Sequence, residues 1–99
     1  MTALWIAHVT VTDPDSYGRY AKEAGPAITA HGGVFLARGG RYHQLEGNER
    51  ARHVVARFPS VDAAVACYHS SEYQAALAHA KGASERDLVI VEETPPATE

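Results

Sequence analysis

Four segments of this 99-residue chain are typical of β-strands, and long helical stretches separate some of them but not others. The four run from Ala3 to Thr12, Val34 to Arg38, Ala51 to Phe58 and Asp87 to Glu93, and each is rich in β-branched or aromatic residues. A helical stretch follows the first strand and another follows the third, whereas a short extended piece, Arg41 to Leu45, and a turn join the second to the third. The order β-α-β-β-α-β predicts an α+β, ferredoxin-like fold, with an antiparallel sheet, both helices on one face and the first strand central, beside the third and fourth.

The first helical stretch has start and stop signals in the sequence. Asp13 is suited to cap its amino terminus, with Pro14 at the first helical position, and the glycine pair at 32–33 is suited to end it. The Gly-Pro pair at 25–26 predicts a kink or a short break inside it.

The second helical stretch is predicted in two pieces. Ser60 is suited to cap a helix over 61–69, and a second piece is expected to begin near Ser70 or Ser71 and to end at Gly82. We expect residues 1–94 to form a single domain and the polar residues 95–99 to form a disordered tail.

Alternation along each strand divides the side chains between two faces of the sheet. The face expected beneath the helices is almost wholly apolar and comprises Trp5, Ala7, Val9, Val11, Phe35, Ala37, Val54, Ala56, Phe58, Val89 and Val91. The second face mixes aliphatic with charged side chains and comprises Ile6, His8, Thr10, Val34, Leu36, Arg38, His53, Val55, Arg57, Leu88, Ile90 and Glu92. A sheet face left in water is usually polar, so we expect a second copy of the chain to cover this one in a homodimer.

Several stretches also resemble a known family over nearly the whole chain. They are "VTDPDSYGRY", "HGGVFLARGG", "FPSVDAAVACYHSSEYQ" and "DLVIVE", and the chain is similar in them to a bacterial family called domain of unknown function 1330. The resemblance implies the dimeric α+β barrel fold, whose superfamily includes cofactor-free monooxygenases, isomerases and cyclases as well as haem-dependent relatives. The family has no generally assigned reaction, so the resemblance implies no catalytic residue. Ser71 departs from the pattern, because the similar proteins often have proline there.

The second face supplies candidates for chemistry. His8 and Arg38 are candidate catalytic residues, because a histidine can act as a general base near about pH 7 while an arginine holds a carboxylate or an enolate oxygen. The candidate ligand-binding residues are His53, Arg57, Tyr17 and Glu92. The alternative is that these groups only pair with one another or across the dimer, with Glu92 neutralising an arginine.

Two functional hypotheses follow, and the sequence does not establish whether the protein is an enzyme. The first is a homodimer that binds a small polar or anionic organic molecule in a pocket of the barrel, with cofactor-free proton transfer or isomerisation as its reaction if it is an enzyme. The second is a non-catalytic binding or stress-associated module, in which the polar face only locks the dimer.

Composition excludes other classes. The net charge of −3 gives no reason to expect nucleic acid or a membrane as partner, although the segment 38–57 holds five arginines against two glutamates. Cys67 is the only cysteine, no histidine pair has a metal-site spacing, and no nucleotide-binding fingerprint is present, so we expect neither a metal nor a bound cofactor. With no export signal or membrane-spanning run in this sequence, we expect a cytoplasmic location.

Overall fold

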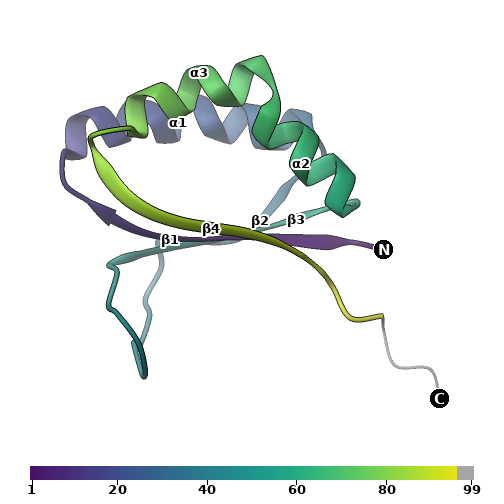
Figure 1. Ribbon diagram of the computed structural model, residues 1–99, viewed down its shortest axis with the longest axis horizontal. Helices are drawn as coiled ribbons and strands as arrows, with labels where there is room; N and C mark the ends of the chain where they lie inside the picture. Colours follow the sequence, from purple (N-terminus) through teal and green to yellow (C-terminus); the bar gives the residue numbers. More distant parts are fainter. Residues whose placement is uncertain (96–99) are drawn as a thin grey trace.

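The computed structural model describes residues 1–95 of the chain. Its elements are, in order, β1 (Ala3–Val11), α1 (Pro14–Ala30), β2 (Val34–Arg38), β3 (Arg52–Phe58), α2 (Val61–His69), α3 (Ser71–Ala80) and β4 (Ser84–Glu92). Figure 1 shows the three helices together on one face of a curved sheet, while the segment between β2 and β3 extends from the other face. The α+β, ferredoxin-like fold is confirmed, and the second helical stretch is divided into α2 and α3 as expected. The extended piece predicted at 41–45 lies in the segment between β2 and β3 and forms no strand.

The sheet is antiparallel, with β1 at its centre. The strand order is β2-β3-β1-β4, which confirms the predicted neighbours of the first strand. Residues that stand opposite one another in neighbouring strands point to the same face. Ala7 of β1 stands opposite Val54 of β3 and Leu88 of β4, whereas His8, one residue later, stands opposite His53 and Asp87.

This register defines two faces, which we call the helix side and the outer face. The helix side carries Trp5, Ala7, Val9, Phe35, Arg38, Arg52, Val54, Ala56, Phe58, Arg86, Leu88 and Ile90. The outer face carries Leu4, Ile6, His8, Val34, Ala37, His53, Val55, Arg57, Asp87, Val89 and Val91. The prediction was right for β1 and β3 but wrong for β4 and for the end of β2.

The apolar side chains of β4 face the opposite way from the prediction. Leu88 and Ile90 pack against the core, whereas Val89 and Val91 are 53% and 47% exposed on the outer face. Four consecutive apolar residues show no alternation, so the sequence offers two equivalent choices of face. The pairing of Ile90 with Trp5 decides between them.

Arg38 also lies on the opposite side of the sheet from the prediction. The pairing of β2 with β3 shifts between Phe35 and Ala37, which is a β-bulge at Leu36. One extra residue in a strand moves every later side chain to the other face. Arg38 therefore stands opposite Val54 on the helix side.

The residues predicted to begin and end α1 do so, but the helix is not broken at the predicted place. The Asp13 side chain accepts a hydrogen bond of 3.3 Å from the Ser16 backbone N–H, and Gly32 ends the helix with a φ of +86°. The prediction at 25–26 was a kink or a short break, and the break was wrong, because the helix continues through Pro26. Pro26 is exposed while its neighbour Gly25 is buried, and packing of this face on the sheet and α3 offsets the one backbone hydrogen bond that proline removes.

An aromatic cluster around Trp5 forms the centre of the core. The Trp5 ring is 1% exposed and lies 5.6 Å from Phe58 and 5.1 Å from Tyr73, measured between ring centroids. Burial of one such side chain contributes about 1.5–3 kcal/mol to stability. This cluster holds α2 and α3 against the sheet.

Two further points concern the whole chain. Among residues 1–95, no helix is long and apolar enough to cross a membrane. The predicted disordered tail, residues 95–99, lies outside the described residues except for Pro95.

Candidate functional site

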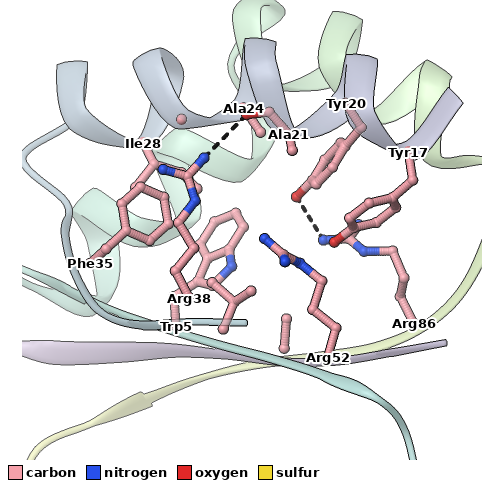
Figure 2. Close-up of a pocket in the computed structure, with 13 residues that line it drawn as sticks. Trp5, Tyr17, Tyr20, Ala21, Ala24, Ile28, Phe35, Arg38, Arg52 and Arg86 are labelled. Carbon is pink, nitrogen blue, oxygen red and sulfur yellow. Dashed lines mark hydrogen bonds between the residues drawn. The ribbon is translucent and has the colours of Figure 1, made fainter. Parts of the chain in front are cut away.

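A narrow cavity lies between α1 and the sheet, and its lining is apolar and aromatic except for three arginines. Counting its open mouth, it encloses about 350 Å³. The residues around it are Trp5, Ala7, Tyr17, Tyr20, Ala21, Ala24, Gly25, Ile28, Phe35, Arg38, Arg52, Val54 and Arg86. Figure 2 shows the guanidinium groups of Arg38, Arg52 and Arg86 arranged along the cavity beneath α1.

Arg52 projects from the start of β3 into the middle of the cavity (Figure 2). Its Nε atom is buried without a hydrogen-bond partner, and its Cζ atom lies 5.7 Å from the centre of the Tyr17 ring. Gly39 makes room for it, because a Cβ atom at Gly39 would collide with Nη1 of Arg52. Arg52 is thus a donor held inside the cavity with unused hydrogen-bonding capacity.

Arg38 stands at the mouth of the cavity and is exposed. Its Nη2 atom donates to the carbonyl oxygen of Ala21 at 3.3 Å, and its guanidinium lies 4.2 Å from the centre of the Phe35 ring. Gly25 permits this approach, because a Cβ atom there would come within 3.0 Å of Nη2. One long hydrogen bond and one ring contact hold this side chain.

Arg86 closes the other end of the cavity together with two tyrosines. Its Nη2 atom donates to the hydroxyl oxygens of Tyr20 at 2.8 Å and of Tyr73 at 3.1 Å. The two hydroxyl oxygens are 2.7 Å apart. Burial raises the pKa of both tyrosines, so both hydroxyls are protonated at neutral pH.

The cavity therefore concentrates positive charge without a negative partner. None of the residues that line it is acidic, and within residues 1–95 no carboxylate oxygen lies within 4.0 Å of the guanidiniums of Arg38, Arg52 or Arg86. Arg52 and Arg86 are half-buried, so their guanidiniums lose part of their hydration without gaining a carboxylate partner, whereas Arg38 is exposed. An anion in this cavity would offset that loss.

A second polar cluster lies on the outer face around two histidines. The Nδ1 atoms of His8 and His53 are 2.8 Å apart, so one ring donates and the other accepts. The Tyr42 ring lies 4.6 Å from the His53 ring, measured between centroids. Next to the pair, Arg50 donates to Asp87 at 3.0 Å. The chain's own groups thus pair most of these polar atoms, but Nε2 of His53 is buried without a hydrogen-bond partner.

Arg57 is also paired on the outer face, but not with the predicted acid. It binds both carboxylate oxygens of Glu93, at 2.7 and 3.2 Å, and these hydrogen bonds lower the pKa of Glu93. Glu92 instead stands opposite Ala3, on the helix-side register, and its side chain is exposed. The placement of Glu92 beside an arginine on the outer face was wrong, because the strand's register is one residue away from the one expected.

The structure divides the predicted site residues between two places. His8, His53 and Arg57 lie on the outer face, whereas Tyr17 and Arg38 line the cavity. The prediction of one site that combines His8 with Arg38 was therefore wrong, because these two residues lie on opposite faces of the sheet.

Sequence reasoning missed several residues of the cavity, namely Trp5 as a lining residue together with Tyr20, Arg52 and Arg86. Arg52 is two residues from Val54 in β3, so alternation places both side chains on the same face of the sheet. This pattern was sufficient to predict Arg52 on the helix side. The alternation pattern could not place Arg86, because β4 begins at Ser84, three residues before the predicted start of the strand.

Cysteine and metal chemistry receive no support from the described residues. Cys67 is buried, its thiol approaches the Ala27 carbonyl oxygen at 3.7 Å, and burial raises the pKa of the thiol to about 11. Within residues 1–95, His, Cys, Asp and Glu side chains form no group of three or more that could hold a metal ion.

Comparison with known proteins identifies one family, and its description assigns it no function. The sequence model of a family described as domain of unknown function (DUF1330) matches residues 2–94. No protein of curated function matches the chain in sequence.

Solved structures with the same fold are distant in sequence. A protein of unknown function from Rhodopseudomonas palustris is 20% identical with a TM-score of 0.77, over 96% of this chain and 84% of that one. SnoaB from Streptomyces nogalater, a cofactor-independent oxygenase, is 10% identical with a TM-score of 0.68, over 99% and 98%. A dimeric protein of unknown function with a ferredoxin-like fold from Bacteroides fragilis is 14% identical with a TM-score of 0.55, over 93% and 96%. At these identities the likeness concerns the fold alone.

Proposed function

The chain belongs to the family of the domain of unknown function DUF1330, and we propose that it is a cytoplasmic homodimer. From the geometry of its cavity we propose that it binds a small organic anion between α1 and the sheet. The observation that carries this proposal is the convergence of Arg38, Arg52 and Arg86 on an apolar cavity without an acidic residue in its lining. Arginine suits carboxylate and enolate oxygens because its planar fork offers two parallel donors. Aromatic walls from Trp5, Tyr17, Tyr20 and Phe35 favour a ligand with a flat apolar body.

Arg52 is the principal anion-binding residue in this proposal, and Arg38 is the residue that admits the ligand. The Nε atom of Arg52 is unused inside the cavity, whereas Arg38 is exposed and held by a single hydrogen bond. Because the interior is narrow, entry of a ring requires the Arg38 side chain to move. The outer face contributes the dimer contact and not the ligand site.

A titration with the fluorescence of Trp5 as signal tests the proposal. Trp5 is the only tryptophan and it lines the cavity, so a bound ligand changes its emission. We expect benzoate to bind wild type and the cation benzylamine not to bind. Arg52→Gln should weaken benzoate binding by roughly tenfold or more, because a hydrogen bond to a charged group contributes about 1.5–3 kcal/mol.

A matched variant controls for the loss of one positive charge. Arg19 is exposed on α1 and does not line the cavity, so Arg19→Gln should leave the benzoate affinity unchanged. Equal weakening by the two substitutions, or equal binding of benzoate and benzylamine, would refute a specific anion site. Isothermal titration calorimetry measures the same affinities without relying on Trp5.

A second candidate function is the transformation of the bound anion without a cofactor. The observation that favours it is that arginine and tyrosine hydrogen-bond donors line the cavity. Because no carboxylate or imidazole lines it, solvent water accepts the proton in this candidate reaction. Such a site stabilises a developing enolate or phenolate, and anion stabilisation is a large part of catalysis in many enzymes. The likeness to SnoaB, a cofactor-independent oxygenase, is compatible with this chemistry.

A chromogenic phenol separates this candidate from a purely non-catalytic binding or stress-associated module. With 4-nitrophenol held at a pH below its own pKa, a stabilising cavity increases the fraction of yellow phenolate, and Arg52→Gln removes that increase. A cavity that binds benzoate but leaves the ionisation of the phenol unchanged would favour the non-catalytic module.

A further inference from the structure

Two tyrosines and one arginine at the inner end of the cavity form a closed hydrogen-bonded triangle. Arg86 Nη2 donates to both hydroxyl oxygens, at 2.8 Å for Tyr20 and 3.1 Å for Tyr73, and the oxygens lie 2.7 Å from one another. Tyr20 lines the cavity, while Tyr73 lies behind it and is 0% exposed. The triangle therefore connects the cavity to the core.

The triangle contains two hydroxyl hydrogens, and only one of them can lie between the two oxygens. Each protonated hydroxyl carries one hydrogen, and a 2.7 Å separation between two oxygens places one of those hydrogens between them. The second hydrogen belongs to whichever tyrosine accepts the first. It needs an acceptor of its own, because Arg86 only donates.

The surroundings of the two hydroxyls differ in where this second hydrogen can go. Within residues 1–95, the Tyr73 hydroxyl has only Tyr20 and Arg86 as hydrogen-bond partners, so a hydrogen turned away from Tyr20 would be buried without an acceptor. The Tyr20 hydroxyl points toward the cavity and the guanidinium of Arg52 (Figure 2). A hydrogen that Tyr20 turns away from Tyr73 enters the cavity, where solvent or a ligand oxygen can accept it, whereas the Tyr73 hydrogen has no such acceptor. Because an unsatisfied buried donor is costly, the arrangement in which Tyr73 donates to Tyr20 has the lower free energy.

We propose that Tyr73 donates to Tyr20, and that Tyr20 in turn donates its hydroxyl hydrogen to an oxygen of the anion that Arg52 binds. This assignment rests on the proposed function. It adds the Tyr20 hydroxyl as a neutral hydrogen-bond donor and the direction in which the hydrogen bonds are donated. Tyr20 is a ligand-contacting residue, and Tyr73 is a positioning residue that acts through it. The ligand class is accordingly an oxyanion, a carboxylate or an enolate, with one oxygen for Arg52 and one for Tyr20.

The ligand affinities of two phenylalanine variants test the direction. Tyr20→Phe removes the donor and should weaken benzoate binding by roughly tenfold, as expected for a hydrogen bond to a charged group. Tyr73→Phe leaves the Tyr20 hydroxyl free to donate and should weaken it by less than about threefold. Tyr68→Phe is the control, because Tyr68 packs against Trp5 and Tyr73 but does not line the cavity. Equal affinities for wild type and Tyr20→Phe, or a larger loss in Tyr73→Phe, would overturn the assignment.

Thermal unfolding without ligand separates a failure of this assignment from a failure of the proposed function. Tyr20→Phe leaves the Tyr73 hydrogen without an acceptor and should lower Tm by about 5 °C or more, whereas Tyr73→Phe should lower it by less than about half as much. If wild type binds no benzoate, the proposed function fails. In that case the Tm values alone test whether Tyr73 donates to Tyr20. A Tyr73→Phe variant as destabilised as Tyr20→Phe refutes this direction.

Discussion

The arginines on the two faces of the sheet differ in what neutralises them. On the outer face, Arg50 pairs with Asp87 at 3.0 Å and Arg57 with Glu93 at 2.7 Å. On the helix side, Arg38, Arg52 and Arg86 line an apolar cavity that no acidic residue lines. The outer face is thus balanced in charge by the chain itself, whereas the helix side lacks an anion.

The apolar side chains show the opposite contrast. On the helix side, the helices cover Trp5, Ala56 and Phe58, each no more than 1% exposed. On the outer face, Val34 is 61% exposed and Val89 is 53% exposed. The comparison supports the proposal that a ligand completes one face and a second copy of the chain the other, because an apolar sheet surface of this kind marks an interaction site.

The largest expected effect is the loss of the dimer on placing a charge in the outer face. Val89→Asp should weaken self-association by roughly a hundredfold or more, because a carboxylate would be buried without a partner in the contact. Sedimentation equilibrium measures the dissociation constant. Val65 is 40% exposed on α2, away from this face, so Val65→Asp should leave the dimer intact. A Val89→Asp variant that remains a dimer contradicts the outer-face contact.

Two adjacent valines of β3 allow a finer test, because they point to opposite faces. Val54→Ala should lower the unfolding free energy of the dissociated chain by about 1–2 kcal/mol, since Val54 is 9% exposed among the core residues. Val55→Ala should cost the dissociated chain less and should weaken the dimer instead. Urea unfolding of diluted samples and sedimentation distinguish the two effects. Equal stability losses, with no change in association for either variant, would remove the distinction between the faces.

The smallest expected effect is the loss of the hydrogen bond between two histidines of the outer face. The Nδ1 atoms of His8 and His53 are 2.8 Å apart, and His8→Ala removes this contact between β1 and β3. Because the pair is exposed, urea unfolding should show a loss of only about 0.5 kcal/mol, the lower end of the range for a hydrogen bond. A loss of about 2 kcal/mol or more would contradict this account of the pair.

The sequence was sufficient for the fold because its signals agreed with one another. Alternation fixed the faces of β1 and β3, and Asp13 and Ser60 cap their helices as expected, with Ser60 accepting from the Ala63 N–H at 3.0 Å. Pro26 suggested a break that does not form, because the packing of α1 offsets the one hydrogen bond that proline removes.

The candidate site was harder to predict, because its residues depend on register. A single bulge residue, Leu36, moves Arg38 from the outer face to the cavity, and nothing in "VFLAR" signals it. In β4, the pairing with β1 decides between two equally apolar faces and thereby places Arg86. Such long-range choices are made between strands and leave no trace in either strand alone.

A crystal structure of the protein with 4-bromobenzoate tests the central claim most directly, because the anomalous signal of bromine locates the ligand independently of the protein density. We predict the bromine peak in the cavity beneath α1, among the aromatic side chains, with the carboxylate within hydrogen-bond distance of Arg52 and Tyr20. A peak beside His8 and His53 on the outer face, or no peak in the cavity at a concentration that saturates the Trp5 signal, would contradict the account.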